Sequence, residues 1–315
     1  TKQINGRILA NSSDFSHMLL FDGNDILISG DHGITSKKIM LDEIKIYGVD
    51  LNNSSHKVSN NGRYYATIGY NESSESKDAK LIVELYDMQN NISRQAIINK
   101  RLSLMCFTDD SKKLLLLNNK EGLNVYDTEN LNLLKNYSDI KEDSGNMILS
   151  KDSKILVLNS YVGIAYVYNL DTGEHIEDIP GEVVYVENSN DEIKLKGIKN
   201  NYVFTWSSKN GLNSWELDEE CNQTALSFND VNLYNKKSDI LMMIRNNNID
   251  RKCYIVDFST GKLKMTLNSA IKDKDINGHI SYDGNIVVID QYYDVDYNKE
   301  NSTSSVYIGS TLYNI

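Results

Sequence analysis

Three of the five histidines could together hold a metal ion. His17, His56 and His279 each fall near the start of a predicted β-strand. Imidazole nitrogens are common zinc ligands, and three of them meeting at one point leave the fourth tetrahedral position open. They are far apart in the sequence, so only a fold that gathers distant strand starts could use them. The alternative is that each imidazole packs or forms a hydrogen bond near its own strand.

A second candidate for metal chemistry is Asp294–Glu300, which reads DVDYNKE. Its alternating oxygen-bearing side chains have the spacing of a calcium loop. The glycine expected at the sixth position and the glutamate expected at the twelfth are Lys299 and Ser305. The segment therefore favours a solvated acidic loop, and we expect no metal and no cofactor.

The charge balance limits the kinds of partner. The net charge is -11 and the pI is about 5.0. This disfavours a nucleic-acid binder, which needs a basic face for phosphates, and binding to an anionic membrane surface. No apolar run is long enough to span a bilayer. We expect a soluble protein with neither nucleic acid nor membrane insertion among its interactions.

The cysteines favour a reducing, cytoplasmic compartment. Cys106, Cys221 and Cys253 are widely spaced and odd in number, which suits free thiols. Glycosylation sequons keep a secreted or cell-surface protein as the alternative; they begin at Asn11, Asn53, Asn71, Asn91, Asn136, Asn222 and Asn301. The chain starts at Thr1 without a methionine, so we expect one domain of a larger polypeptide.

Short apolar runs separated by polar turns indicate the elements that must position these residues. Runs rich in Ile, Val, Leu and Tyr predict four antiparallel strands between Asn146 and Gly181. The predicted strands are Met147–Leu149, Ile155–Leu158, Ile164–Tyr168 and His175–Ile179. The pattern recurs about every forty residues, a spacing typical of β-propeller blades.

A turn between the first two strands marks each repeat. It is rich in Ser, Thr, Asp, Asn and Gly, because a tight hairpin needs positive φ or a side chain that bonds its own backbone. Seven such turns begin at Phe21, Ser59, Thr108, Ser150, Asn188, Asn235 and Ser281. They predict seven blades over about residues 14–52, 53–100, 101–137, 143–181, 182–228, 229–269 and 276–315.

The strand register is less clear in two blades. In the first blade we expect Lys38–Leu41 and Lys45–Val49 as the outer strands. In the fifth, the third strand is either Tyr202–Trp206 or Leu212–Trp215. The second choice is favoured because the sequence GLNSW there repeats the GLNVY that begins at Gly122.

The two ends of the chain predict how the blades close. Too few residues follow Tyr307 for a complete outer strand, whereas Ile4–Ser13 matches the outer-strand segment Thr260–Asn268 and the residue after it. We therefore expect residues 1–10 to form the outer strand of the last blade. Residues 1–315 would then make one closed domain without an open edge.

The turn, the Tyr-Asp ending of the third strand and the Thr-Gly turn after it resemble WD40-like seven-bladed propellers over nearly the whole chain. The segments that carry the resemblance include Val83–Asp87, Leu123–Asp127, Asp171–Glu174 and Ser259–Lys262. The pattern departs from true WD40 repeats. Tyr largely replaces Trp, and the Gly278-His279 pair lies too close to its turn. The resemblance implies a divergent, all-β, seven-bladed propeller.

Signatures of propeller enzymes are missing from the sequence. There is no Ser-x-Asp-x-Gly-x-x-Trp box, nucleophile elbow or phosphate-binding glycine loop. Trp206 and Trp215 are too few for the Trp-docking repeats of quinoprotein dehydrogenases. We expect no enzyme. An enzyme, metal site or small-molecule site at the central channel, with His17, His56 and His279 as the candidate groups, is the main alternative.

Long connections between second and third strands predict a binding face, since long loops on a rigid scaffold commonly carry recognition. The connections are Asn71–Ala79, Arg245–Lys252 and Asp290–Ser304. Candidate partner-binding residues on them are Tyr292, Tyr293, Asp294, Asp296, Tyr297, Arg245, Arg251, Glu72 and Glu75. The alternative is that these loops are tolerated drift, because lengthening a surface loop costs little.

These observations predict a non-catalytic interaction or ligand-sensing module. Its partner would be another protein or an effector domain of the same polypeptide. A surface adhesion or glycan-binding propeller is a further alternative. The step from fold to binding is an analogy, since propellers serve unrelated functions.

Overall fold

The computed structural model describes residues 7–11, 17–21, 26–30, 35–39, 56–70, 81–98, 104–118, 121–140, 144–221, 231–246, 251–268, 275–280, 286–296 and 303–314. Regular structure in these ranges is almost entirely β-strand, with one short 3-10 helix, η3 (Glu219–Cys221). The chain divides into two compact units. The N-terminal unit is Ile8–Pro180 with Val186–Asn188, and the C-terminal unit is Thr1–Arg7, Gly181–Tyr185 and Ser189–Ile315.

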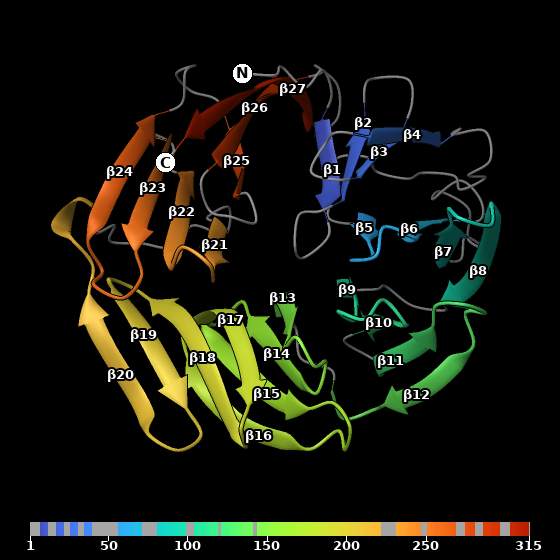
Figure 1. Ribbon diagram of the computed structural model, residues 1–315, viewed down its shortest axis with the longest axis horizontal. Helices are drawn as coiled ribbons and strands as arrows, with labels where there is room; N and C mark the ends of the chain where they lie inside the picture. Colours follow the sequence, from blue (N-terminus) through green and yellow to red (C-terminus); the bar gives the residue numbers. More distant parts are fainter. Residues whose placement is uncertain are drawn as a thin grey trace. The chain divides into compact units, whose positions relative to one another are not determined.

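Four sheets belong mainly to the N-terminal unit, and each joins four consecutive strands (Figure 1). The first contains β1 (Arg7–Asn11), β2 (Met18–Phe21), β3 (Ile26–Gly30) and β4 (Thr35–Ile39). The second contains β5 (His56–Val58), β6 (Tyr64–Tyr70), β7 (Leu81–Asp87) and β8 (Ile92–Ile98). The third contains β9 (Leu104–Phe107), β10 (Lys113–Asn118), β11 (Gly122–Asp127) and β12 (Leu133–Tyr137). The fourth contains β13 (Ser144–Leu149), β14 (Ile155–Ser160), β15 (Ile164–Asn169) and β16 (His175–Pro180).

The remaining sheets belong mainly to the C-terminal unit. One contains β17 (Glu182–Ser189), β18 (Glu192–Lys199), β19 (Tyr202–Ser207) and β20 (Gly211–Glu216). The next contains β21 (Val231–Asn235), β22 (Ile240–Asn246), β23 (Arg251–Asp257) and β24 (Leu263–Asn268). The last contains β25 (Asp275–Ile280), β26 (Ile286–Asp296) and β27 (Thr303–Asn314). The prediction of an all-β fold built from four-stranded antiparallel sheets is confirmed.

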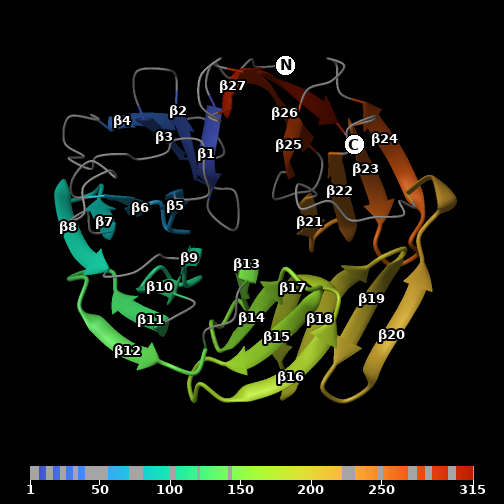
Figure 2. The ribbon, with the colours of Figure 1, turned by 180° about the vertical axis from the view of Figure 1, so that it is seen from behind.

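Sheets of the N-terminal unit pack face to face. The first strands β5, β9 and β13 lie beside one another, with the fourth strands β8, β12 and β16 on the far side of their sheets (Figures 1 and 2). Successive side chains of a strand point to opposite faces. In β10, Leu114 and Leu116 therefore pack toward β5–β8, while Leu115 and Leu117 pack toward β13–β16. All four are fully buried, and each contributes roughly 2 kcal/mol to stability.

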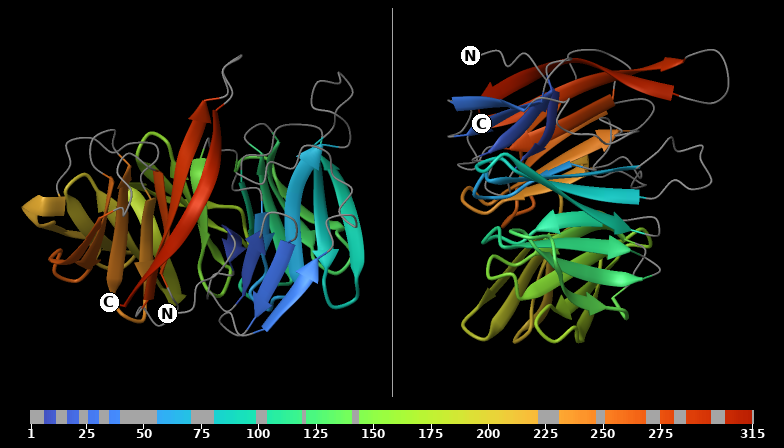
Figure 3. Two further views of the ribbon diagram at one scale, coloured as in Figure 1. Left: turned by 90° about the horizontal axis from the view of Figure 1, so that it is seen from above. Right: turned by 90° about the vertical axis from the view of Figure 1, so that its right-hand side faces the viewer.

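The C-terminal unit repeats this arrangement around β22. Leu241 and Met243 pack with residues of β17–β20, and Met242 packs with Ile280 and Val287 of the last sheet. An apolar run is needed wherever both faces of a sheet are covered, which explains why these strands carry no polar alternation. The last sheet differs in strand length, since β26 has 11 residues and β27 has 12. Figure 3 shows them as a long twisted hairpin.

The pairing of third and fourth strands is irregular at the same place in three sheets. A register shift lies between Val125 and Tyr126, between Val167 and Tyr168, and between Ile255 and Val256. The turn beyond each shift has four residues, and its last residue has positive φ: Leu131 at 57°, Gly173 at 82° and Gly261 at 69°. In each turn the N–H of this residue donates a hydrogen bond to the carbonyl four residues earlier, at 2.7–2.9 Å.

The N-terminal strand does not complete the last sheet. β1 joins the first sheet beside β2, while the described part of the last sheet has three strands. β1 and β2 are separated by a few residues, so pairing them closes a short loop, whereas pairing β1 with the last sheet closes almost the whole chain. As a result β2 is the second strand of its sheet, not the first, and β4 occupies Thr35–Ile39. Residues 40–55, which include the predicted strand Lys45–Val49, lie outside the described residues.

The favoured register of the fifth blade is also wrong. The third strand is β19 (Tyr202–Ser207), and the Leu212–Trp215 segment lies in the fourth strand, β20. The short turn at Asn200, where φ is 51°, lets Lys199 pair directly with Tyr202, so β19 follows β18 at once. That residues 1–315 form a single domain stays a prediction.

Candidate interaction surface

The first turn has the same hydrogen bonds in three consecutive sheets of the N-terminal unit. A Ser or Thr hydroxyl accepts a hydrogen bond from the backbone N–H five residues later and donates one to the Asn or Asp side chain two residues later. That side chain accepts from the N–H two residues beyond it. The three turns begin at Ser59, Thr108 and Ser150. This pattern is the physical basis of the repeat seen in the sequence.

The fourth residue of each turn has positive φ: Gly62 at 65°, Ser111 at 61° and Ser153 at 58°. Glycine would adopt this conformation without strain. Ser111 and Ser153 adopt this strained conformation, and the hydroxyl of each accepts a hydrogen bond from the first turn of the preceding sheet. The Asn61 backbone N–H donates to Ser111 Oγ at 3.1 Å, and the Asp109 backbone N–H donates to Ser153 Oγ at 3.3 Å. Hydrogen bonds therefore connect the first turn at Ser59 to the one at Thr108, and the one at Thr108 to the one at Ser150.

The second turn, between third and fourth strands, lies at the same end of each sheet. Its first residue, Asp87, Asp127 or Asn169, accepts hydrogen bonds from two backbone N–H groups of its own turn. The next residue donates its backbone N–H to a carbonyl of the first turn, at 2.7–3.0 Å in all three sheets. The Asp of the Tyr-Asp marker is thus a turn cap in these sheets.

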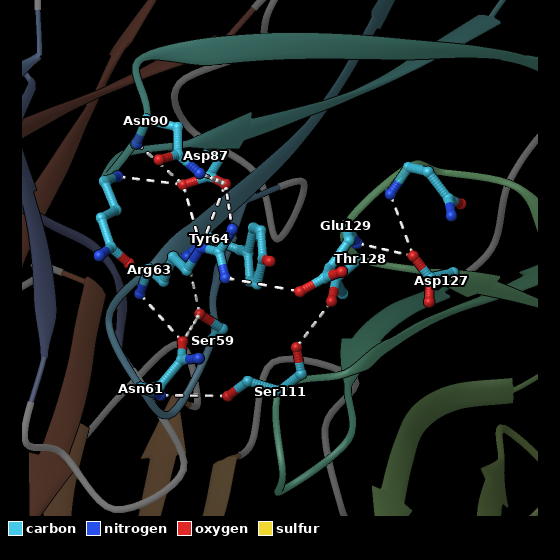
Figure 4. Close-up of polar contacts among 12 residues, drawn as sticks. Ser59, Asn61, Arg63, Tyr64, Asp87, Asn90, Ser111, Asp127, Thr128 and Glu129 are labelled. Carbon is cyan, nitrogen blue, oxygen red and sulfur yellow. Dashed lines mark hydrogen bonds and ion pairs between the residues drawn. The ribbon is translucent and has the colours of Figure 1, made fainter.

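Arg63 and Asp87 make the strongest ionic contact of this network (Figure 4). Arg63 Nη2 lies 2.7 Å from Asp87 Oδ2, and the Asp87 side chain is fully buried. Burial raises the pKa of Asp87, but hydrogen bonds from Arg63 and Asn90 outweigh it and bring the pKa to about 2. The Arg63 guanidinium also lies 4.8 Å above the ring of Tyr64. We call these first and second turns of β5–β16 the turn network.

The opposite end of the β13–β16 sheet presents an apolar hairpin tip. Tyr161 and Val162, between β14 and β15, are 60% and 77% exposed. The tip is held by a hydrogen bond from Ser160 Oγ to the Ile164 carbonyl at 2.8 Å and by Gly163, which has φ of 77°. The Tyr161 ring lies over Gly145, since a Cβ there would come within 2.9 Å of Tyr161 Cε1. We call Tyr161 and Val162 the β14–β15 tip.

The predicted channel histidines are placed differently from one another. The His56 ring is buried, and its Nδ1 lies 2.7 Å from Tyr65 Oη and 3.1 Å from Thr67 Oγ1. His17 precedes β2 and lies beside Gly62, where an added Cβ would come within 2.1 Å of its ring. His279 is on β25, in the other unit. The contacts of His56 match the alternative of an imidazole bonded within its own sheet.

His56 belongs to a buried polar row across the β5–β8 sheet. The register pairs His56 with Thr67 and Thr67 with Glu84, so these side chains share one face. Burial raises the pKa of Glu84, although Ser93 donates a hydrogen bond to its carboxylate and opposes that rise. Burial also raises the pKa of Tyr65.

Four predicted partner-binding residues lie within β26 instead of a loop: Tyr292, Tyr293, Asp294 and Asp296. Their backbone pairs with β27, from Tyr292 with Tyr307 to Asp296 with Thr303. Tyrosine and valine favour extended backbone, which carries the hairpin past the point where the acidic residues suggest a loop. The expected long loop is wrong for this segment.

The other predicted partner-binding residues divide into two groups. Arg245 and Arg251 lie on paired strands, opposite Lys252 and Asn246. Glu72, Glu75 and Tyr297 lie outside the described residues. The β14–β15 tip lies on a short connection, so a search for long loops does not find it. An aromatic residue, a β-branched residue and a glycine between two strands would have indicated an exposed apolar hairpin tip.

Within the described ranges, no three His, Cys, Asp or Glu side chains are grouped closely enough to hold a metal ion. The same part of the chain contains no helix long and apolar enough to cross a membrane. A scan against protein-family models finds no match, and a search of the curated proteins finds no similar sequence.

Proposed function

We propose that this chain is a seven-bladed, WD40-like propeller that recognises a protein partner through hairpin tips between second and third strands. The repeated sheets and the adjacency of β5, β9 and β13 support the arrangement, because first strands lie together in a propeller. The partner is a separate protein or an effector domain of the same polypeptide. No catalytic step is assigned to the chain.

The observation that carries the proposal is the exposure of the β14–β15 tip. Tyr161 and Val162 project from a hairpin whose backbone is fixed by Ser160 and Gly163. Apolar and aromatic side chains on a rigid support lose little conformational entropy when they bind, and such residues dominate interface energies. The turn network cannot serve the same role, because its carboxylates and hydroxyls already bond within the protein.

Paired capture from the native lysate tests this proposal. The wild-type chain, a Tyr161→Ser/Val162→Ser variant and a Leu133→Ser/Leu134→Ser control serve as baits. Leu133 and Leu134 are each 53% exposed on β12, so the control removes similar apolar area elsewhere. We expect one protein to be retained by the wild type and the control and lost at least about tenfold with the tip variant. Equal retention by all three baits would show that the tip does not bind.

The predicted tyrosine surface is tested in the same experiment. A Tyr292→Ser/Tyr293→Ser/Tyr297→Ser variant should also lose the partner if the C-terminal hairpin takes part in recognition. Loss with the β14–β15 variant alone would assign recognition to that tip. Loss with the tyrosine variant alone would move the binding surface to β26.

A further inference from the structure

Some asparagines of the chain are followed directly by glycine, and such a pair can modify itself. The backbone nitrogen of the glycine attacks the side-chain amide carbon of the asparagine, and the missing Cβ of glycine leaves the approach unobstructed. Asn5-Gly6 lies outside the described residues. The structure describes three further pairs, and it constrains them differently: Asn61-Gly62, Asn210-Gly211 and Asn277-Gly278.

The pair at Asn61 is fixed within the turn network. The Gly62 N–H, which must lose its proton before the attack, donates a hydrogen bond to the Ser59 carbonyl at 2.9 Å. The Asn61 side chain accepts from Ser59 Oγ at 2.7 Å and from the Arg63 backbone N–H at 3.0 Å. The His17 ring lies against Gly62. Ring closure at this pair would therefore break the hydrogen bonds that hold the first turn.

The pair at Asn277 lies inside a strand. Asn277 and Gly278 belong to β25, where they pair with Asp290 and Ile289 of β26. Ring closure requires the asparagine backbone to leave the extended conformation. This pair can therefore react only when β25 separates locally from β26.

The pair at Asn210 is much less constrained. It lies where the turn at residues 208–210 meets β20, and both of its residues are exposed. Gly211 has φ of 71°, an added Cβ there would meet no atom within 4 Å, and its pairing with Ser207 is the terminal pair of the β19–β20 hairpin. Among the described residues, the Asn210 side chain makes one hydrogen bond, from Nδ2 to Glu192 Oε1 at 3.3 Å. Terminal pairs of exposed hairpins open most easily, so this turn can reach the geometry of attack.

We propose that Asn210 is a site of spontaneous deamidation. The deprotonated Gly211 nitrogen bonds to the Asn210 side-chain amide carbon, the bond from that carbon to Nδ2 breaks, and ammonia leaves with the proton that Gly211 lost. Water then opens the cyclic imide to aspartate or isoaspartate, and no oxidant or reductant is needed. Both products place a carboxylate near Glu192, where the amide had donated a hydrogen bond. Because like charges repel, the modification should loosen the β19–β20 hairpin.

Peptide mapping of the aged protein tests the proposal. The folded chain is incubated in mildly alkaline buffer, and mass spectrometry measures over time the fraction of aspartate plus isoaspartate at each pair. Asn61 and Asn277 are internal references, since glycine follows both. We expect Asn210 to convert at least about tenfold faster than either reference, because only its reacting atoms can reach the geometry of attack. Conversion of Asn210 no faster than that of Asn61 or Asn277 would overturn the proposal.

A control in urea separates the effect of the fold from that of the local sequence. In urea, where the turn network and the pairing of β25 with β26 are lost, the three pairs should react at similar rates. A preference for Asn210 that persists there would overturn the structural argument.

The loosening of the hairpin is tested with matched variants. Asn210→Asp reproduces one product and loses the amide donor. Asn130→Asp is the control, because the Asn130 side chain accepts a hydrogen bond from the Asn132 N–H and a carboxylate can do the same. We expect faster hydrogen exchange at residues 207–213 in Asn210→Asp and unchanged exchange at residues 128–134 in Asn130→Asp. Unchanged exchange in Asn210→Asp would contradict the loosening of the hairpin.

Discussion

The two ends of the β13–β16 sheet are built on opposite principles. At the end that carries the turn network, Ser, Thr, Asp and Asn side chains bond to the backbone and to the next sheet. At the other end, the β14–β15 tip exposes Tyr161 and Val162, and the side chain that fixes its backbone is Ser160. The polar end uses its hydrogen-bonding groups for stability, whereas Tyr161 and Val162 of the apolar tip are largely exposed to solvent. Polar residues at a repeated turn are thus a poor guide to function in this fold.

The largest effect should come from breaking the ion pair of the turn network. Asp87→Ala leaves Arg63 without its carboxylate and removes the cap of the second turn. We expect a loss of about 3 kcal/mol in the free energy of unfolding, measured by urea titration. Asp127 forms no ion pair with another described residue, so Asp127→Ala removes only a cap and should cost about 1 kcal/mol. Equal costs for the two variants would mean that the Arg63 contact adds nothing.

The same pair gives a pH dependence with a defined sign. The pKa of Asp87 is lowered to about 2, so its ionised form stabilises the folded state above the unfolded pKa near 4. That stability is lost as the pH falls from about 4 through about 2. Asp87→Asn should therefore flatten this part of the stability profile. An unchanged acid profile would show that other carboxylates dominate it.

A smaller effect is expected from the bond between turns. Ser111→Ala removes the hydroxyl that accepts from Asn61 and keeps a side chain at positive φ, so it should cost roughly 1–2 kcal/mol. Ser111→Gly loses the same bond but relieves the strain of the left-handed conformation. It should cost at least about 0.5 kcal/mol less than the alanine variant. A glycine variant less stable than the alanine variant would contradict our account of why serine stands there.

The smallest effect on stability should come from the β14–β15 tip. Tyr161→Ser/Val162→Ser removes exposed side chains, and the change in unfolding free energy should stay within about 0.5 kcal/mol. The same variant is expected to lose its partner in the capture experiment. A loss of several kcal/mol would show that the tip supports the fold and would make the two ends alike.

The sequence predicted the turns well because they depend on local chemistry. A hydroxyl, a short carboxylate or amide, and a residue that tolerates positive φ act within six residues of one another, so Ser59 and Ser150 could be recognised directly. The place of β1 and the register of β19 depend on which strands pair. The sequence GLNSW that begins at Gly211 resembles the GLNVY that begins at Gly122. This similarity carries no information about which strands pair.

The candidate sites were less predictable for a related reason. His56 looked like a ligand because histidine often is one. The cross-strand register that brings Thr67 to its ring, with Tyr65 bonded to the same nitrogen, could not be read from spacing alone.

Two hydrogen bonds from a backbone N–H of one first turn to a serine hydroxyl of the next run in the same direction. The earlier turn donates its N–H, and the later turn provides the serine hydroxyl, both from Asn61 to Ser111 and from Asp109 to Ser153. The β9–β12 repeat therefore donates through the Asp109 N–H to the repeat after it and accepts through the Ser111 hydroxyl from the repeat before it, as a subunit of a head-to-tail polymer does. A duplicated copy of the β9–β12 repeat placed after the original would have a backbone N–H before it to accept from and a serine hydroxyl after it to donate to. The copy would therefore reuse the bond from a backbone N–H to a serine hydroxyl.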